Sequence, residues 1–442
     1  MTGSNRAPSS RPHRARRYAA LAILVASGLI AAGCGTAKPN ATQLDPQAVS
    51  GSSAAKTPVT DLHISPAPGS TQAATASGIT VNAVQGAKIA KVTVTTAGDP
   101  VTGSMNSTGT SWQSTWALDT DRSYTVTATG ADSAGHPITA TSSFHTLTPA
   151  QSFSTEVFEG SGATYGVGMP VMLTFTSPIS NKAAVERSLQ LTTSKPVVGS
   201  WYWDGSESVY FRPREYWPAD TAVTLTAHLN GVDAGSGRYG THTLTQSFDI
   251  GQSVIAVAST ASHQTQVYIG GKLAYTWPIS TGRATMPTPD GTYLTVQKGN
   301  PVRMIGGTKG TPSYYNELVN WAVRFTFSGD YYHSAPWSVV DQGVSNVSHG
   351  CVNLPPNDAE TYYNLAIPGD PITITGSQKA GNWDDGWTEW FLSWSQYLKG
   401  SATGMAVEAG PQGSSFVAPS AVATSSATSP LGTSVAGNYL AS

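Results

Sequence analysis

The chain has 442 residues, which predicts roughly two to four folded units instead of one domain. Only 11% of the residues are charged and the formal net charge is -2, so the chain has no broad basic field and we expect no binding to nucleic acid. Glycine and proline are plentiful, and Thr, Ser, Val and Tyr recur in short alternating runs, a composition typical of secreted all-β proteins.

The first 34 residues have the pattern of an export signal. Arginines up to Arg17 precede an apolar run over residues 18–30, and small residues then lead to Cys34. The apolar run is too short for a membrane-spanning helix with these flanks. Small residues before a cysteine resemble a bacterial lipobox, although Ala31 stands where that motif usually has Leu. We therefore expect lipidated Cys34 to anchor the protein on the outer face of the cell membrane, with ordinary secretion and cleavage near Ala32 as the alternative.

The chain has two cysteines, Cys34 and Cys351. Lipidation of Cys34 would leave a single thiol in the mature protein. Because an unpaired cysteine in an oxidising compartment is prone to modification, its presence favours a catalytic role for Cys351.

The segment before the third folded unit predicts a tether and two similar modules. Residues 35–58 are rich in Ala, Ser, Thr, Pro and Gln, which predicts a flexible tether. Short strand-like runs fill residues 59–148 and 149–250. Residues 124–128 resemble residues 223–227, and residues 143–144 resemble residues 247–248, which indicates a tandem repeat with a period of about 100 residues. This length and strand density predict two immunoglobulin-like sandwiches.

The third unit, residues 252–375, is also expected to be mainly strands. Its clearest element is a β-hairpin over residues 265–277, with Gly270-Gly271 at the turn. Proline residues predict a short helix after Cys351, and a final strand over residues 371–375 closes the unit.

The C-terminal extension divides into two parts. Between Trp383 and Trp394, four tryptophans are spaced by four, three and four residues. This spacing places the indoles on one face of a helix within residues 376–400, which we expect to pack on the third unit. Residues 401–442 lack a pattern and are predicted to be disordered.

Two segments of the third unit contain the residues best suited to chemistry. The first is His333-Ser334-Ala335-Pro336-Trp337, and the second, after ten further positions, is Ser348-His349-Gly350-Cys351-Val352-Asn353. In a β-rich unit such segments form loops between strands, where a rigid scaffold displays reactive groups.

Cys351 is the candidate nucleophile. A thiol near its free pKa of about 8.5 is mostly protonated at neutral pH, so acyl transfer requires a neighbouring base or positive charge. An imidazole can supply both. His349 would share a face with Cys351 in an extended segment, whereas His333 can reach the thiol only through folding. The spacing does not decide between the two histidines.

Gly350 predicts a tight backbone turn next to the nucleophile. Such a turn could direct successive amide N–H groups, including that of Cys351, at one point in space. Donors arranged in this way stabilise the oxyanion of a tetrahedral intermediate, and loss of one donor costs about 3 kcal/mol.

Two other readings of these residues remain. Cys351 could be a buried structural thiol beside incidental histidines, but a lone exported thiol with two histidines and a glycine favours catalysis. His333, His349 and Cys351 could instead bind zinc. No nearby second cysteine or Cys-x-x-Cys motif supports a zinc site, so we expect no metal and no other cofactor.

The two segments resemble the signature of the YkuD-type L,D-transpeptidases. The resemblance extends upstream through Ser280-Thr281-Gly282 and residues 288–293, and it covers the whole third unit. Two immunoglobulin-like modules, a lipobox and a Trp-rich extension are similar to the actinobacterial members of this family. The implied fold is mainly β, with two immunoglobulin-like sandwiches followed by a β-sandwich catalytic domain that has short helices.

The resemblance also implies roles for individual residues. Cys351 would be the nucleophile, and His333 the base, oriented by the backbone carbonyl of Ser334. His349 and Gly350 would shape the nucleophile loop. The expected substrate-binding residues are Met304, Tyr315, Ser328, Gly329, Trp337, Ser348 and Asn353, with Tyr315 on a lid. Some relatives hold calcium in the second module, but Ser236 follows Asp233 here where a carboxylate would be wanted, so we predict no metal.

The activity implied by the resemblance is ping-pong acyl transfer between peptidoglycan stem peptides. Cys351 would attack the bond before the terminal D-Ala of a tetrapeptide stem, and an amine of meso-diaminopimelate on a second stem would resolve the thioester. Carbapenems would acylate the same sulfur. Water as acceptor would give an L,D-carboxypeptidase. A cysteine endopeptidase of peptidoglycan and a non-catalytic envelope-binding lipoprotein remain as alternatives.

Overall fold

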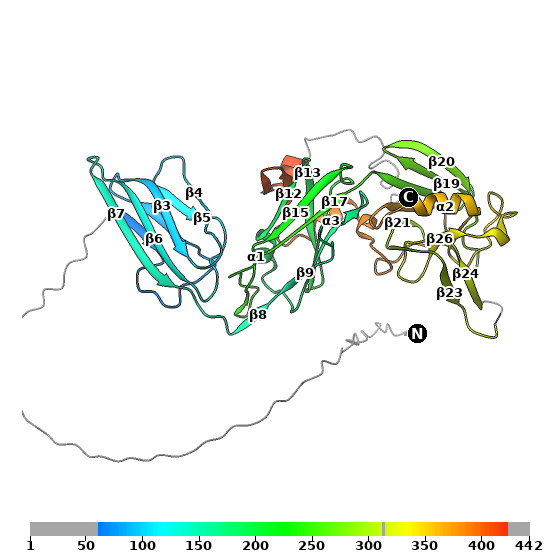
Figure 1. Ribbon diagram of the computed structural model, residues 1–442, viewed down its shortest axis with the longest axis horizontal. Coiled ribbons are helices and arrows are strands. Elements are labelled where there is room, and N and C mark those ends of the chain that lie inside the picture. Colours follow the sequence, from blue (N-terminus) through cyan, green and yellow to red (C-terminus); the bar gives the residue numbers. More distant parts are fainter. Residues whose placement is uncertain (1–60, 312–313, 423–442) are drawn as a thin grey trace, which may run out of the picture. The chain divides into compact units, whose positions relative to one another are not determined.

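The computed structural model describes residues 61–311 and 314–422, which are mainly strands joined by short helices and loops, as the composition predicted (Figure 1). The expected signal peptide, the lipidation site Cys34 and the tether lie outside the described residues, as do residues 423–442 of the expected tail. None of the described helices has the length and apolar character needed to cross a membrane.

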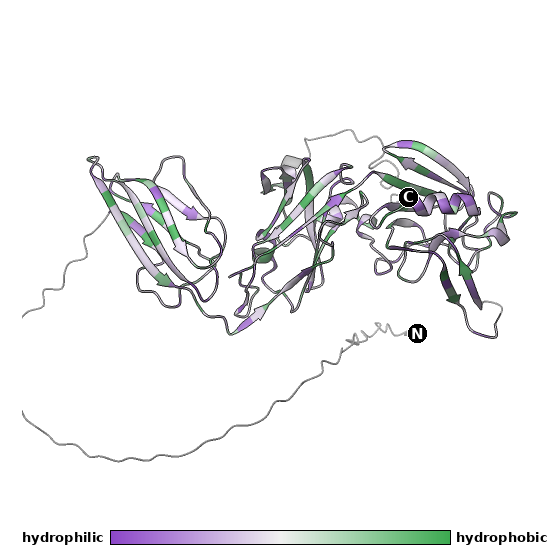
Figure 2. Cartoon of the chain, viewed as in Figure 1, coloured by the Kyte–Doolittle hydropathy of each residue, from purple (hydrophilic) through white to green (hydrophobic). Residues whose placement is uncertain are grey.

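The first β unit contains seven strands. They are β1 (Leu62–Ser65), β2 (Thr80–Ala83), β3 (Lys88–Thr96), β4 (Gly103–Met105), β5 (Ser111–Ser114), β6 (Ser123–Ala131) and β7 (Pro137–His145). β1, β2, β5 and β4 form one sheet, and β3, β6 and β7 form another. Figure 2 shows hydrophobic and polar residues alternating along the long strands, and the alternate residues Tyr124, Val126 and Ala128 of β6 are buried in the core.

The second β unit follows directly. Its elements are β8 (Gln151–Phe153), β9 (Thr155–Val157), β10 (Thr164–Tyr165), β11 (Val171–Phe175), α1 (Lys182–Arg187), β12 (Leu189–Thr193), β13 (Val197–Asp204), β14 (Ser208–Pro213), β15 (Thr221–Ala227), β16 (Arg238–Gly240) and β17 (Leu244–Ile250). Residues matched by the sequence repeat occupy matching places. Tyr124 pairs with Phe144 across β6 and β7, and Val223 pairs with Phe248 across β15 and β17.

The third unit contains the strands that position the chemistry. Its elements are β18 (Val254–Ser259), β19 (Gln264–Ile269), β20 (Lys272–Pro278), β21 (Gly291–Leu294), β22 (Gln297–Gly299), β23 (Val302–Gly306), β24 (Tyr315–Val319), β25 (Ala322–Arg324), β26 (Tyr331–Ser334), η1 (Pro336–Ser338), β27 (Val352–Leu354), α2 (Pro356–Leu365) and β28 (Pro371–Thr375). The hairpin expected around Gly270-Gly271, the short helix after Cys351 and the final strand are all present.

Three sheets make up the third unit. One has the strand order β20-β19-β18-β28-β21, the second has the order β22-β25-β26-β27, and β23 and β24 form a separate two-stranded hairpin. Side chains from the two larger sheets and from α2 share one apolar core, which includes Tyr293, Phe325, Tyr332 and Tyr362. This core supports the ends of β26 and β27.

The Trp-rich segment is not the single helix that the tryptophan spacing predicted. It forms η2 (Glu389–Phe391) and α3 (Trp394–Leu398), and loops fill the rest. Gly386 adopts a φ of 135° between the first two tryptophans, a conformation that interrupts a helix. The Trp390 indole donates to the carbonyl of Gly168 at 2.8 Å and packs on Tyr216 of the second unit. The expected packing on the third unit is therefore only partly correct, through Phe391 against Tyr293.

Residues 401–422 are ordered, contrary to the prediction. They form β29 (Ala406–Gly410), β30 (Gly413–Val417) and α4 (Pro419–Val422), and β29 extends the sheet of the second unit by pairing with β13. The buried carboxylate of Glu186 explains this order. It accepts hydrogen bonds from the Ser401 hydroxyl at 2.5 Å, the Ala402 N–H at 2.7 Å and the Thr403 hydroxyl at 2.7 Å. Because Glu186 is more than 200 residues away from its donors, the sequence around residues 401–403 has no local pattern that predicts this order.

Candidate active site

The parallel pairing of β26 with β27 brings the two sequence segments together. Tyr332 lies opposite Val352 and His333 lies opposite Asn353. Cys351 immediately precedes β27, so the register places it level with Tyr331, two positions along β26 from His333. The separation of eighteen residues along the chain is thus closed by the sheet, as the hypothesis of a His333 base requires.

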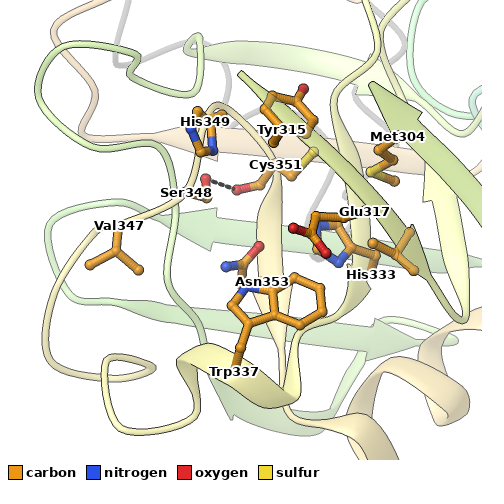
Figure 3. A pocket seen from close by; sticks show the side chains of 11 residues that line it. Met304, Tyr315, Glu317, His333, Trp337, Val347, Ser348, His349, Cys351 and Asn353 are labelled. Atoms are coloured by element: carbon orange, nitrogen blue, oxygen red, sulfur yellow. Dashed lines mark hydrogen bonds between the residues drawn. The ribbon is translucent and has the colours of Figure 1, made fainter. Parts of the chain in front are cut away.

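One pocket of about 380 Å³ contains both residues (Figure 3). Eight of the residues predicted for the site line it, and they are Met304, Tyr315, His333, Trp337, Ser348, His349, Cys351 and Asn353. The sulfur therefore faces a space that a peptide can enter.

His333 is held as a neutral base. Its ring is 4% exposed, and Nδ1 lies 2.9 Å from the carbonyl oxygen of Ser334. Because a carbonyl oxygen only accepts, Nδ1 carries the proton and Nε2 keeps its lone pair. Burial lowers the pKa of His333 to about 4, so the imidazole is neutral at physiological pH.

Cys351 is a protonated thiol in this pocket. The thiol is 9% exposed and donates a long hydrogen bond of 3.8 Å to the carbonyl oxygen of Gly329. Burial, and then the negative charge of Asp330, raise the pKa of Cys351 to about 12. The resting state is therefore a neutral thiol beside a neutral imidazole.

His349 is placed differently from His333. Its ring also lines the pocket, but it is half-buried and lies against the Tyr315 ring with centroids 4.6 Å apart. Burial, and then the charge of Arg283, lower the pKa of His349. The structure shows a fixed tautomer for His333, which favours His333 as the base and His349 as a wall of the pocket.

The nucleophile loop requires glycine at position 350. Gly350 has a φ of 139°, and a Cβ there would lie 2.3 Å from Oδ1 of Asp330. The Ser348 hydroxyl accepts from the Gly350 N–H at 3.2 Å and donates to the Cys351 carbonyl at 2.6 Å. The Gly350 carbonyl accepts from the Thr288 hydroxyl at 2.6 Å.

The hydrogen bonds of the nucleophile loop determine which backbone N–H group is free to bind an oxyanion. The Gly350 N–H is already used by Ser348, so the expected run of successive free donors is not found. Within the described residues, the Cys351 N–H has no acceptor. This amide is the candidate oxyanion donor.

A lid of two strands covers the pocket. Met304 on β23, and Tyr315, Glu317 and Val319 on β24, point into the pocket from alternate positions. The Tyr315 ring lies directly over Gly306, where a Cβ would come within 2.5 Å of it. Tyr315 thus lies on the hairpin that borders the pocket, and its role as a lid tyrosine remains a prediction of the family resemblance.

Four predicted residues do not line the pocket. The carbonyl of Ser334 orients His333, the carbonyl of Gly329 accepts the thiol hydrogen bond, and Gly350 shapes the loop. Ser328 is further from the chemistry. Its hydroxyl donates to the Asp385 carboxylate at 2.6 Å, which holds a loop, and Ser328 does not line this pocket.

Sequence reasoning missed several residues of the site. Glu317, Val319 and Val347 line the pocket, and the buried carboxylate of Asp330 lies behind the nucleophile loop. Burial raises the pKa of Asp330 to about 6. Tyr315, Glu317 and Val319 occupy alternate positions of one strand, so the prediction for Tyr315 could have been extended to Glu317 and Val319. Nothing local to Asp330 indicated its burial.

No group of three or more His, Cys, Asp or Glu side chains arranged to hold a metal ion occurs in the part of the chain that the structure describes.

Comparison with known proteins links the third unit to one family. Residues 253–374 match the model of the L,D-transpeptidase catalytic domain, and residues 70–233 match a bacterial immunoglobulin domain. L,D-transpeptidase 2 of Mycobacterium tuberculosis is 34% identical over 324 residues, which cover 71% of this chain and 79% of that protein. L,D-transpeptidase 5 of the same species is 35% identical over 69% of each chain. The solved structure of LdtMt1 in complex with imipenem is 37% identical, covers 51% of this chain and all of that one, and has a TM-score of 0.44.

The neutral resting state predicts a steep pH profile for alkylation of Cys351. With iodoacetamide, the rate should be slow at pH 7 and rise about tenfold per pH unit, because only the thiolate reacts and the thiol pKa is near 12. Asp330→Asn should accelerate the reaction, because it removes a negative charge that raises this pKa. Quantitative peptide mass spectrometry of the Cys351 peptide measures both effects.

Glu360→Gln, which neutralises an exposed carboxylate on α2, is the matched control and should leave the profile unchanged. A flat rate across neutral pH would instead indicate a thiolate–imidazolium pair and contradict the neutral assignment.

Proposed function

The chain belongs to the L,D-transpeptidase family, and from this premise we propose that it transfers peptidoglycan stem peptides through a thioester on Cys351. The observation that supports the proposal most directly is the placement of the Cys351 thiol and the His333 imidazole in one pocket, with the Nδ1 proton of His333 fixed by Ser334. This arrangement leaves Nε2 as an acceptor for the thiol proton.

The first step forms the thioester. The Cys351 sulfur attacks the carbonyl carbon of the peptide bond before the terminal D-Ala, while Nε2 of His333 accepts the thiol proton. Because both groups are neutral at rest, this proton transfer accompanies formation of the C–S bond. The Cys351 N–H stabilises the oxyanion. When the intermediate collapses, the imidazolium returns the proton to the departing D-Ala amine.

The second step resolves the thioester. The side-chain amine of meso-diaminopimelate on a neighbouring stem attacks the thioester carbon and gives its proton to His333. The proton then passes to the sulfur as the C–S bond breaks, which restores the thiol. The product is a cross-link between two diaminopimelate residues. Attack by water in place of the amine gives the L,D-carboxypeptidase reaction.

Incubation with disaccharide-tetrapeptide tests this function. The wild-type protein should produce dimers and free D-Ala, and Cys351→Ala should produce neither. His333→Ala should lower the rate about 10²–10⁴-fold, because a general base is lost, whereas His349→Ala should lose much less. Separation of the products by liquid chromatography with mass spectrometry gives the rates.

The alternatives predict different results in the same assay. An endopeptidase would form no dimers but would cut preformed ones, and a non-catalytic binding protein would behave identically after Cys351→Ser. Either result would reject the transpeptidase proposal.

We also propose that carbapenems acylate Cys351, because the reaction of the sulfur with a β-lactam carbonyl uses the same base and oxyanion donor as the first step. Intact-protein mass spectrometry should show one adduct on the wild-type protein and none on Cys351→Ala. An unmodified wild-type protein, or an equal adduct on the variant, would contradict the assignment of the nucleophile.

We further propose that a lipid on Cys34 anchors the protein to the outer face of the cell membrane and places the third unit in the cell-wall space. The apolar run over residues 18–30 and the small residues before Cys34 support this. In membrane fractionation, the wild-type protein should sediment with membranes and Cys34→Ala should become soluble. A mature N-terminus other than a lipidated Cys34 would reject the anchor.

A further inference from the structure

Glu317 brings an unexpected charge into the catalytic pocket. It lies in the middle of β24 opposite Met304, and Figure 3 shows its side chain reaching from the lid into the pocket that His333 and Cys351 line. No sequence pattern assigned a role to Glu317, and neither step of the proposed acyl transfer uses it.

Glu317 is the only residue lining this pocket with a formal charge at neutral pH. Burial keeps His333 and Cys351 neutral by shifting their pKa values to about 4 and about 12. The lowered pKa of His349 and the raised pKa of Tyr315 keep these two side chains uncharged as well. The other lining residues do not ionise. The pocket therefore carries one negative charge.

This carboxylate has no partner within the described protein. The salt bridges between described residues join His136 to Asp132 and His145 to Asp121, and no described side chain or amide hydrogen-bonds to the carboxylate of Glu317. The carboxylate of Glu186, by contrast, is saturated by donors from residues 401–403. Glu186 is buried and depends on these protein donors, whereas Glu317 is exposed to the pocket, where a ligand that donates hydrogen bonds can replace the water around its carboxylate.

A ligand suited to Glu317 carries a primary ammonium group. Of the species in the reaction, the leaving D-Ala end of the donor is a carboxylate, which a negative charge repels, and water is neutral. The diamino-acid side chain of the donor also carries an ammonium, and the test below separates binding of that group from binding of the acceptor. The acceptor stem arrives with its amine protonated. We propose that Glu317 binds the ammonium of the acceptor's diamino-acid side chain and so selects the amine over water; this inference rests on the transpeptidase function proposed above.

The proton balance agrees with this role. The bound ammonium releases one proton to solvent to become nucleophilic, and its second proton passes through His333 to the Cys351 sulfur as the C–S bond breaks. Glu317 takes part in neither bond change. Its contribution is to hold the amine beside the thioester, which raises the rate of transfer without changing the rate of hydrolysis.

Separate donor and acceptor substrates test the proposal. The donor is a tetrapeptide stem whose side-chain amine is acetylated, so that it can acylate Cys351 but cannot accept. The acceptor is a tripeptide stem with a free side-chain amine. Mass spectrometry follows the acyl-enzyme, and chromatography measures the ratio of dimer to hydrolysed donor as the acceptor is titrated.

For Glu317→Gln we expect the KM for the acceptor to rise about tenfold, the effect of losing one charge-assisted hydrogen bond, and the ratio of dimer to hydrolysis to fall in parallel. The rate of acyl-enzyme formation without acceptor should be unchanged. Glu317→Asp should retain part of the effect, and Glu360→Gln, an exposed charge-matched control on α2, should behave as wild type. With the wild-type protein, added salt should raise the acceptor KM by screening the ion pair.

Other outcomes are decisive as well. Acyl-enzyme formation is therefore also measured with a donor whose side-chain amine is free. Slower acylation of Glu317→Gln by this donor, with an unchanged ratio of dimer to hydrolysis, would place Glu317 on the donor side and overturn the proposal, as would no change in either quantity. If Glu317→Gln does not fold, an acceptor KM of the wild-type protein that is independent of salt overturns it. Failure of the wild-type protein to form any acyl-enzyme would instead reject the proposed function itself.

Discussion

The hydrogen bond from Nδ1 of His333 to the carbonyl oxygen of Ser334 determines what this pocket can do. It fixes the tautomer, so that Nε2 keeps a lone pair, and it fixes the ring plane against the backbone of the same strand. The parallel pairing of β26 with β27 then places this ring beside the loop that carries Cys351. A histidine that could rotate, or that carried its proton on Nε2, would not accept a proton from the thiol.

Burial sets the second constraint, because it keeps both reacting groups neutral. With the pKa of Cys351 raised to about 12 and the pKa of His333 lowered to about 4, the neutral thiol and imidazole are favoured over an ion pair at rest. The protonated thiol therefore reacts slowly with other electrophiles. It becomes nucleophilic when a substrate carbonyl is bound, because the negative charge then moves onto the carbonyl oxygen. Asp330 strengthens this protection, since its carboxylate lies against Gly350 and disfavours a thiolate.

The sequence predicted what local patterns encode. Alternating strands, the Gly270-Gly271 turn and the segments around His333 and Cys351 each follow from a few neighbouring residues, and the structure has all of them. The wrong predictions concern segments whose structure is determined by contacts with residues distant in sequence. The tryptophan spacing suggested a helix, but Gly386 interrupts it and Trp390 is drawn to the second unit. The order of residues 401–403 depends on Glu186, and the choice between His333 and His349 depends on strand pairing.

The lid links access to chemistry. β23 and β24 form a two-stranded sheet, and such a hairpin is marginally stable without packing on another surface. That surface is a small apolar cluster in which Met304 and Val319 from the lid meet Tyr331 and Cys351. Cys351 thus belongs to the apolar cluster that holds the lid in place over it. An acyl group on the sulfur must occupy space that the lid side chains border. Formation of the thioester therefore shifts the lid through steric contact alone. The carboxylate of Glu317 moves with the lid.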